Sequence, residues 1–407
     1  ELIAFCAGKR AVLVVEEGHP DYIEQQVNVE LRRADLPTRV FGKGCLPMAG
    51  EFTLDVLLSG LAAFLAETAP AGVDRAAIAS QVESLLARRR AAAAAVGALP
   101  ARFPAFCTGC PERPVFSALK LMQRALGPTH ISADIGCHSF AAFAPFSMGN
   151  SILGYGRSLA SAAAVGPNLD RRPIAVMGDG GFWHNGLVTG VLSSLFNQGD
   201  SVLVIMQNGY ASATGQQYLP SSGTSRAGGS GGVSIEATLR AMGVKWLRKV
   251  RSYSVAAMTR TLKEAMHTAE RGLKVIIADG ECQLARQRRL RVEEGAKLAR
   301  GERVLRQRYG VDDEICTGDH SCIRLSGCPS LTVKPSPDPL RLDPVASVNQ
   351  GCVGCGLCGE VAHAAVLCPS FYRAEVIRNP GLRDRLLYGL RRRVIRMLGG
   401  AVPVAAP

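Results

Sequence analysis

Three short apolar runs alternate with longer amphipathic segments in the middle of the chain. They lie at 174–177, 202–206 and 275–278 and consist largely of Val, Ile, Ala and Met. Such runs, separated by helical segments, are typical of buried strands in a largely parallel sheet. The pattern predicts an α/β domain over residues 105–285.

The first part of the chain shows the same alternation on a smaller scale. An apolar run at 11–15 precedes a helix that Pro20 and Asp21 would start, and 38–41 reads as the next strand. We interpret residues 1–68 as part of an α/β domain, and because the chain enters a strand pattern almost at once we expect the beginning of that domain to be absent. Residues 69–104 are rich in Ala, Arg and Pro, which predicts a surface helix and a linker.

The last third of the chain has a different character. Residues 286–310 are charged and follow a helical pattern, whereas 311–371 contain seven cysteines and little regular periodicity. So small a region is expected to need inorganic cofactors for stability. Residues 372–407 form a basic amphipathic helix and a tail, and this helix is expected to cap a domain, contact a partner or lie on a membrane surface.

The distribution of charge along the chain indicates which kinds of partner it could bind. The 47 Lys and Arg exceed the 34 Asp and Glu, and the excess lies mainly in the Arg-rich stretches 286–307 and 383–396. No signature of a nucleic-acid-binding fold accompanies them, so solvated helices or an acidic protein partner explain the charge better. A long uncharged apolar run and a signal peptide are both missing from the sequence, so we expect no membrane span and a cytoplasmic location.

The spacing of the thirteen cysteines points to metal or cluster ligands in a reducing compartment rather than to disulfides. Cys352, Cys355 and Cys358, followed by Cys368-Pro369, resemble the ligand run of a two-cluster ferredoxin, in which the Cys-Pro member reaches the other cluster. The upstream half has Asp319 where its second cysteine is expected. The gap from Cys358 to Cys368 is also long, which suggests an insertion there.

If the cysteine of each Cys-Pro pair binds the cluster of the other half, the sequence predicts two sets of four ligands. The first is Cys328, Cys352, Cys355 and Cys358, and the second is Cys316, Asp319, Cys322 and Cys368. An oxygen ligand holds iron less firmly than a thiolate does, so the second cluster is expected to lose an iron and become 3Fe-4S.

Polar residues follow two of the predicted central strands. Gly178-Asp179-Gly180-Gly181 ends the first, and Asn208 ends the next. The carboxyl ends of parallel strands lie at one edge of a sheet, where ligands collect, and carboxylate and amide oxygens suit Mg²⁺. A lone Gly-Asp-Gly is usually only a turn, but Asn208 at this spacing favours a metal site.

Two further cysteine motifs stand in the predicted α/β domain. Cys107 and Cys110 form a C-x-x-C motif before a helix, and Cys137 lies within Asp134-Ile135-Gly136-Cys137-His138. On spacing alone the C-x-x-C pair is a redox pair or half of a zinc site.

The Gly-Asp-Gly motif with Asn208 resembles the signature of thiamine diphosphate-binding enzymes, and residues 213–216 resemble the loop that follows it in 2-oxoacid oxidoreductases. The resemblance implies that the side chains of Asp179 and Asn208 and the carbonyl of Tyr210 hold Mg²⁺. It further implies cofactor contacts from loop residues, namely Gly136, His138, Gly178, Gly180, Gly181 and Thr214. His138 is an acid-base candidate or a hydrogen-bond partner.

The same resemblance implies a proximal 4Fe-4S cluster beside the cofactor, with zinc as the alternative. Its ligands would be Cys107, Cys110, Cys137 and Cys282.

The order of parts resembles the alpha subunit of indolepyruvate:ferredoxin oxidoreductases, and residues 14–18 and 42–44 are similar to that family as well. The resemblance implies part of a transketolase C-terminal-like domain, a thiamine diphosphate-binding domain, and a ferredoxin-like module with two clusters. The implied activity is oxidative decarboxylation of a 2-oxoacid, such as an arylpyruvate, to acyl-CoA and CO₂ with reduction of ferredoxin.

This family typically works as a hetero-oligomer with a smaller beta subunit. The glutamate that activates the cofactor is expected in a preceding domain, so no catalytic residue is assigned here. Two alternatives are an electron-transfer subunit without thiamine chemistry and a non-oxidative thiamine-dependent decarboxylase. Asp179 and Asn208 argue against the first, and the cluster-spaced cysteines argue against the second.

Overall fold

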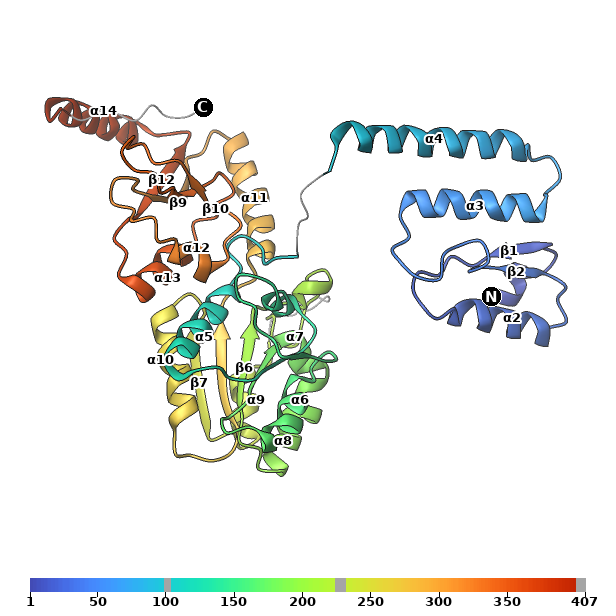
Figure 1. Ribbon diagram of the computed structural model, residues 1–407, viewed down its shortest axis with the longest axis horizontal. Helices are drawn as coiled ribbons and strands as arrows, with labels where there is room; N and C mark the ends of the chain where they lie inside the picture. The colour runs from blue at the N-terminus through green and yellow to red at the C-terminus, as the bar shows by residue number, and fades with distance from the viewer. Residues whose placement is uncertain (99–103, 224–231, 400–407) are drawn as a thin grey trace. The chain divides into compact units, whose positions relative to one another are not determined.

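The computed structural model describes residues 1–98, 104–223 and 232–399. The chain divides into two compact units, residues 1–102 and residues 103–407, called here the N-terminal and C-terminal units (Figure 1). The predicted linker 69–104 lies at this division, and its residues 99–103, like the tail from residue 400 on, fall outside the described ranges.

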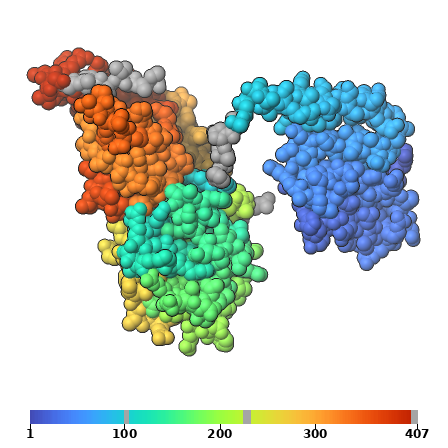
Figure 2. Space-filling model, viewed as in Figure 1, coloured from blue at the N-terminus to red at the C-terminus, as the bar shows by residue number. Residues whose placement is uncertain are grey.

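The N-terminal unit is a small α/β arrangement. Strands β1 (Ala11–Leu13) and β2 (Arg39–Phe41) pair in parallel, with Val12 opposite Val40. The helices of this unit are α1 (Leu2–Cys6), α2 (Tyr22–Arg33), α3 (Leu54–Thr68) and α4 (Arg75–Val96). Its core is small, and α4 packs against α3 without burying any residue fully, so α4 forms part of the outer surface of this unit (Figure 2).

A six-stranded parallel sheet forms the centre of the C-terminal unit, which confirms the predicted α/β class. The strands are β3 (Ile131–Ala133), β4 (Ser151–Ile152), β5 (Ile174–Gly178), β6 (Val202–Gln207), β7 (Trp246–Arg251) and β8 (Lys274–Asp279), in the order β4-β3-β5-β6-β8-β7. The three predicted runs became β5, β6 and β8, whose residues are almost all buried. Their many β-branched residues suit a sheet that is covered on both faces.

Two layers of helices cover this sheet (Figure 1). One core contains residues of α5 (Arg113–Leu126) and α10 (Val255–His267), and the other contains residues of α6 (Ser158–Val165) and α9 (Ile235–Ala241). The short helix α7 (Asp179–Gly181) continues into a π-helix (Phe182–Leu192) and then α8 (Ser193–Phe196). Single 3₁₀ turns occur at Cys137–Ala142, Gly166–Asn168 and Ser212–Thr214.

The cysteine-rich module has more regular structure than its sequence predicted. Helix α11 (Gln283–Ala299) leads into two antiparallel ribbons, β9 (Val304–Val311) with β12 (Phe371–Arg378) and β10 (Leu331–Lys334) with β11 (Val345–Val348). Helices α12 (Ser321–Ser326) and α13 (Leu357–Val366) complete the module. The helical prediction for 286–310 was wrong beyond Ala299, because β9 gains a full ladder of partners from β12.

The module packs on the helical face of the parallel sheet. Leu325, Leu357 and Val361 belong to the same buried core as α5 and α10. A second core inside the module includes Cys316, Cys322 and Cys358. The module and the α/β domain are therefore joined by a continuous apolar contact, which brings cysteines from both parts within reach of one another.

The basic C-terminal helix α14 (Leu382–Met397) buries none of its residues. Its apolar positions, such as Leu386, Leu390 and Val394, are exposed, so the expectation that it caps a domain finds no support in the described residues. Asp384 near its start forms an ion pair with Arg303, 2.7 Å from Nε to Oδ2. In the described parts of the chain, no helix combines the length and the apolar character that crossing a bilayer requires.

Candidate functional site

Asp179 and Asn208 meet at the carboxyl edge of the sheet, as their spacing predicted. Strands β5 and β6 are neighbours, with Gly178 opposite Met206, so the two residues follow adjacent strand ends. The buried carboxylate of Asp179 accepts hydrogen bonds from the backbone of both loops: Gly180 N–H donates to Oδ1 at 3.0 Å and Gly209 N–H donates to Oδ2 at 2.7 Å. These bonds fix the position of the carboxylate.

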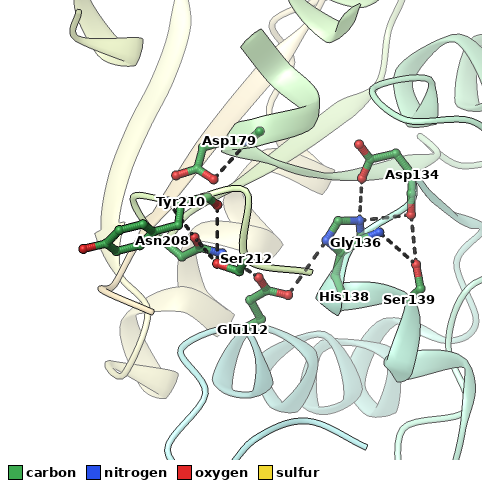
Figure 3. A network of polar contacts seen from close by, with 10 residues as sticks. Glu112, Asp134, Gly136, His138, Ser139, Asp179, Asn208, Tyr210 and Ser212 are labelled. Atoms are coloured by element: carbon green, nitrogen blue, oxygen red, sulfur yellow. Dashed lines mark hydrogen bonds and ion pairs between the residues drawn. The ribbon is translucent and has the colours of Figure 1, made fainter. Parts of the chain in front are cut away.

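The side-chain amide of Asn208 is held in one orientation (Figure 3). Its Nδ2 donates to Glu112 Oε1 at 2.9 Å. Its Oδ1 accepts from Tyr210 N–H at 3.1 Å and from the Ser212 hydroxyl at 2.8 Å. Because the nitrogen is tied to a carboxylate, the amide oxygen must face the loop that carries Tyr210.

The electrostatics of this pair favour a cation. Burial raises the pKa of Asp179, the hydrogen bond from Gly209 lowers it, and the negative charge of Glu112 raises it. The resulting pKa is about 7. No cationic side chain of the described residues forms an ion pair with Asp179. An ionised carboxylate that is buried without a counter-charge is costly, and a divalent ion removes that cost. Carboxylate, amide and backbone oxygens are suitable ligands for Mg²⁺.

The glycines after β5 are required by close neighbours. A Cβ on Gly180 would lie 2.1 Å from the Tyr155 hydroxyl, and one on Gly181 would lie 2.0 Å from Asp134 Oδ2. A Cβ on Gly178 would instead lie 3.6 Å from His138 Cε1, an ordinary contact. The motif therefore needs small residues for packing as well as for the approach of a phosphate, and His138 lies directly beside it.

His138 belongs to a buried network that the sequence did not predict. Its Nε2 contacts the Asp134 carboxylate, and its Nδ1 lies 3.8 Å from Glu112 Oε2 (Figure 3). Burial lowers the pKa of His138, but Asp134 and Glu112 outweigh it, so the net shift is upward. Asp134 Oδ2 also accepts from Gly156 N–H at 2.7 Å. An acidic residue between Ala133 and Ile135 was the available signal for Asp134, whereas Glu112, next to Arg113, gave none.

The remaining predicted cofactor contacts differ in position. Gly136 lies against the ring of His138, since a Cβ there would be 2.4 Å from Cε1. Thr214 is exposed, and its hydroxyl bonds to Gln217 Oε1 at 2.8 Å. Ser212, two residues earlier, is the hydroxyl that reaches Asn208, and sequence reasoning missed it.

We expect Glu112→Leu to weaken the binding of thiamine diphosphate with Mg²⁺ roughly tenfold or more, because the Asn208 amide loses the acceptor that sets its orientation. Glu112→Gln keeps an acceptor oxygen for Asn208 and should stay within about threefold of the parent protein. Calorimetric titration of the cofactor, with iron content as the check on folding, measures both. Equal affinities in the two variants would contradict an orienting role.

The four cysteines predicted for a proximal cluster lie near one another and near Asn208. Cys282 N–H donates to Asn208 O at 3.0 Å, which ties the last cysteine to the metal loop. Burial raises the pKa of Cys137 to about 12, and Glu112, Cys282 and Cys107 raise it further. Burial likewise raises the pKa of Cys110, to which Cys137 contributes. The four residues are called the proximal set below.

The module brings its cysteines together in the two predicted sets. Burial raises the pKa of Cys322 to about 12, and Cys316, Cys368 and Asp319 all add to the shift. For Cys358 the neighbours that raise the pKa, after burial, are Cys355, Cys328 and Cys352. We call these groups the Asp319 set and the Cys355 set. Members far apart in sequence, such as Cys368 and Cys322, become neighbours only through the fold.

All thirteen cysteines are free thiols. Within the described ranges, no three His, Cys, Asp or Glu side chains are arranged to hold a bare metal ion. The sequence left zinc open at Cys107 and Cys110, and the choice between zinc and a cluster stays a prediction. Three groups of neighbouring thiols without disulfides, with Asp319 as the fourth member of one group, fit iron-sulfur ligands in residue type and number.

Comparison with known proteins agrees with this geometry. Residues 134–278 match the thiamine pyrophosphate enzyme C-terminal TPP-binding domain. The chain is 28% identical over 373 residues to the indolepyruvate oxidoreductase subunit IorA of Pyrococcus horikoshii, covering 88% of this chain and 52% of that one. The IorA subunit of Methanothermobacter thermautotrophicus is 27% identical over 375 residues, covering 90% and 53%. The chain thus spans about half the length of the curated relatives it matches.

Among solved structures, a 2-oxoglutarate:ferredoxin oxidoreductase from Magnetococcus marinus aligns with a TM-score of 0.40 and 18% identity, covering 45% of this chain and 66% of that chain. The resemblance predicted from the sequence is confirmed: the chain is similar to indolepyruvate oxidoreductase subunits IorA, and its residues 134–278 match the TPP-binding domain of thiamine pyrophosphate enzymes.

Proposed function

We propose that this chain catalyses oxidative decarboxylation of a 2-oxoacid to acyl-CoA and CO₂ and passes the electrons to ferredoxin. One observation carries the proposal. A backbone hydrogen bond from Cys282 to Asn208 joins the proximal set to the Asp179–Asn208 pair, and that pair lies within the residues that match thiamine pyrophosphate enzymes. A site for electron carriers directly beside a thiamine site suits oxidative rather than simple decarboxylation.

In this proposal the chain's residues hold and orient the cofactor. Asp179, Asn208 and the Tyr210 carbonyl bind Mg²⁺, and Gly178, Gly180 and Gly181 allow the diphosphate to approach the backbone. Bound thiamine diphosphate supplies a nucleophilic carbanion for the keto carbon and an electron sink for decarboxylation. His138, fixed between Asp134 and Glu112, presents its Cε1 edge at Gly178 and so supports the backbone at the phosphate end by packing.

The cysteines bind the iron-sulfur clusters that carry the electrons. The proximal set, the Cys355 set and the Asp319 set each offer four ligands, which accounts for eleven of the thirteen cysteines together with Asp319. Cysteines that serve as ligands instead of forming disulfides support a reducing compartment such as the cytoplasm. None of the described residues is assigned the role of the glutamate that activates the cofactor.

The relatives' names favour an arylpyruvate such as indolepyruvate as the 2-oxoacid. The designation of those relatives as subunits supports a hetero-oligomer with a smaller beta subunit. Coenzyme A is the proposed acyl acceptor.

Product analysis tests the proposal against its alternatives. The complete enzyme with its partner subunit is incubated anaerobically with an arylpyruvate, coenzyme A and an oxidised ferredoxin. Acyl-CoA formed in step with ferredoxin reduction supports it. Aldehyde without ferredoxin reduction indicates the non-oxidative decarboxylase, and ferredoxin reduction by another donor without CO₂ release indicates an electron-transfer subunit.

The cluster with Asp319 gives a prediction that does not depend on turnover. We expect Asp319→Cys to raise the iron content by about one atom per chain and to replace the 3Fe-4S signal by a 4Fe-4S signal in EPR, because thiolate binds iron more firmly than carboxylate. Asp338→Cys, an exposed position of the same module, is the matched control and should change neither. An iron count that is the same in parent and Asp319→Cys would contradict the assignment of Asp319.

A further inference from the structure

Arg113 is completely buried at the first turn of α5, three residues after Cys110. Its Nη1 donates to Ser326 O of α12 at 3.0 Å. Its Nε and Nη2 are buried without any hydrogen-bond partner, and within the described residues no carboxylate forms an ion pair with it. Arginine is almost never buried without a partner, and its position at the positive end of a helix adds to the cost. These free donors therefore require a negative group in the complete enzyme.

The thiols around Arg113 come from both parts of the C-terminal unit. Burial raises the pKa of Cys107 and Cys110 in the proximal set, and the charge of Arg113 opposes that rise. On the module side, the bond to Ser326 O places the guanidinium two residues along the chain from Cys328 of the Cys355 set. The guanidinium thus lies close along the chain to members of two cysteine sets.

The two cysteine loops are in direct contact next to this side chain. Gly109, between Cys107 and Cys110, packs against Val353, since a Cβ on Gly109 would lie 2.4 Å from Val353 Cγ2. The hydroxyls of Thr108 and Ser330 lie 3.3 Å apart across the same boundary. Tyr253 closes it by donating its hydroxyl to Gly109 O at 2.6 Å. The loops that carry the Cys355 set therefore lie directly against the proximal loop.

The positive charge of Arg113 at this position changes the reduction potentials of neighbouring clusters. Four thiolates give an iron-sulfur cluster a net negative charge, and reduction makes that charge larger. A buried cation with free N–H donors stabilises the more negative state, and it does so strongly where water is excluded. Its effect is to raise the reduction potential of the cluster that it faces.

We propose that Arg113 is the cation shared by the clusters of the proximal set and the Cys355 set, and that its free N–H donors raise the reduction potential of both. This inference rests on the proposed function, which supplies the clusters. The step it governs is the transfer of one electron, lost on the proximal side and gained on the Cys355 side. Arg113 keeps its proton throughout and forms no bond. It is a positioning and tuning residue, and the Asp319 set lies outside its influence.

Potentiometric titration followed by EPR tests this on the complete enzyme with its partner subunit. The variants are Arg113→Met, which keeps an unbranched apolar chain, and Arg113→Lys, which keeps the charge without the planar donors. Arg124→Met, an exposed position on the same helix, is the matched control. We expect Arg113→Met to shift two of the three cluster potentials to more negative values, Arg113→Lys to give a smaller shift, and Arg124→Met to give none.

The outcomes separate this inference from the proposed function. Absence of iron and sulfide in the parent enzyme would overturn both. Three clusters in Arg113→Met with unchanged potentials would overturn the inference alone and leave the function standing. Loss of iron in both Arg113 variants, with unshifted potentials in the clusters that remain, would assign Arg113 a purely structural role at the contact with Ser326 and would overturn it as well.

Discussion

Asp179→Asn is expected to reduce the binding of thiamine diphosphate with Mg²⁺ roughly 100-fold or more and to abolish turnover at ordinary cofactor concentrations. Of the three proposed ligands Asp179, Asn208 and the Tyr210 carbonyl, the buried carboxylate is the charged one. Removing one partner of a buried charge pair costs about 3 kcal/mol or more, and each 1.4 kcal/mol is about a factor of ten in affinity. Gly180 and Gly209 donate to different oxygens of Asp179, so in asparagine one of these N–H groups would face an amide NH2, which cannot accept its hydrogen bond.

Calorimetric titration of the cofactor and the thermal stabilisation it causes are the measurements for Asp179→Asn. Asp170→Asn is the control, since Asp170 is exposed and precedes the opposite end of the same strand. Iron content should stay at the parent value in both proteins. An unchanged cofactor affinity in Asp179→Asn would contradict the role of Asp179 as a ligand of Mg²⁺.

Cys110→Ser is expected to lower the iron content by about four atoms per chain and to abolish ferredoxin reduction. Cys110 is buried and central to the proximal set, and serine offers a harder, weaker ligand in nearly the same volume. Thiamine diphosphate should still bind, because Asp179 and Asn208 are untouched. The expected result is therefore a protein that holds the organic cofactor but no longer passes on electrons.

Cys45→Ser serves as the control for this variant, because Cys45 belongs to the N-terminal unit and to none of the three sets. It should retain all iron and all ferredoxin reduction. Ferredoxin reduction at the parent rate in Cys110→Ser would exclude the proximal set from the electron path.

Local sequence patterns predicted the strands that are buried along their whole length. Strands β5, β6 and β8 are continuous runs of buried apolar residues, so their identity follows from composition. Strand β7 was not predicted, because it lies at the edge of the sheet and alternates into exposed basic residues such as Arg248. Strand β9 was likewise hidden in an Arg-rich stretch whose partner, β12, lies some sixty residues later.

The site shows the same division. Asp179, Asn208 and the two cysteine sets of the module were predictable, because a motif at fixed spacing follows from strand ends and ligand runs. The contact between Glu112 and Asn208 spans 96 residues, and the burial of Arg113 depends on the docking of α12. No local pattern contains such information. A charged residue after Cys-Pro would ordinarily be expected at the surface.

The most direct test of the central claim is anaerobic analysis of iron, acid-labile sulfide and thiamine diphosphate in the complete enzyme with its partner subunit, together with EPR. Three clusters, one of them coordinated through Asp319, predict about eleven or twelve irons per chain with matching sulfide and about one thiamine diphosphate. Zinc with little sulfide, or no bound thiamine diphosphate, would contradict the account.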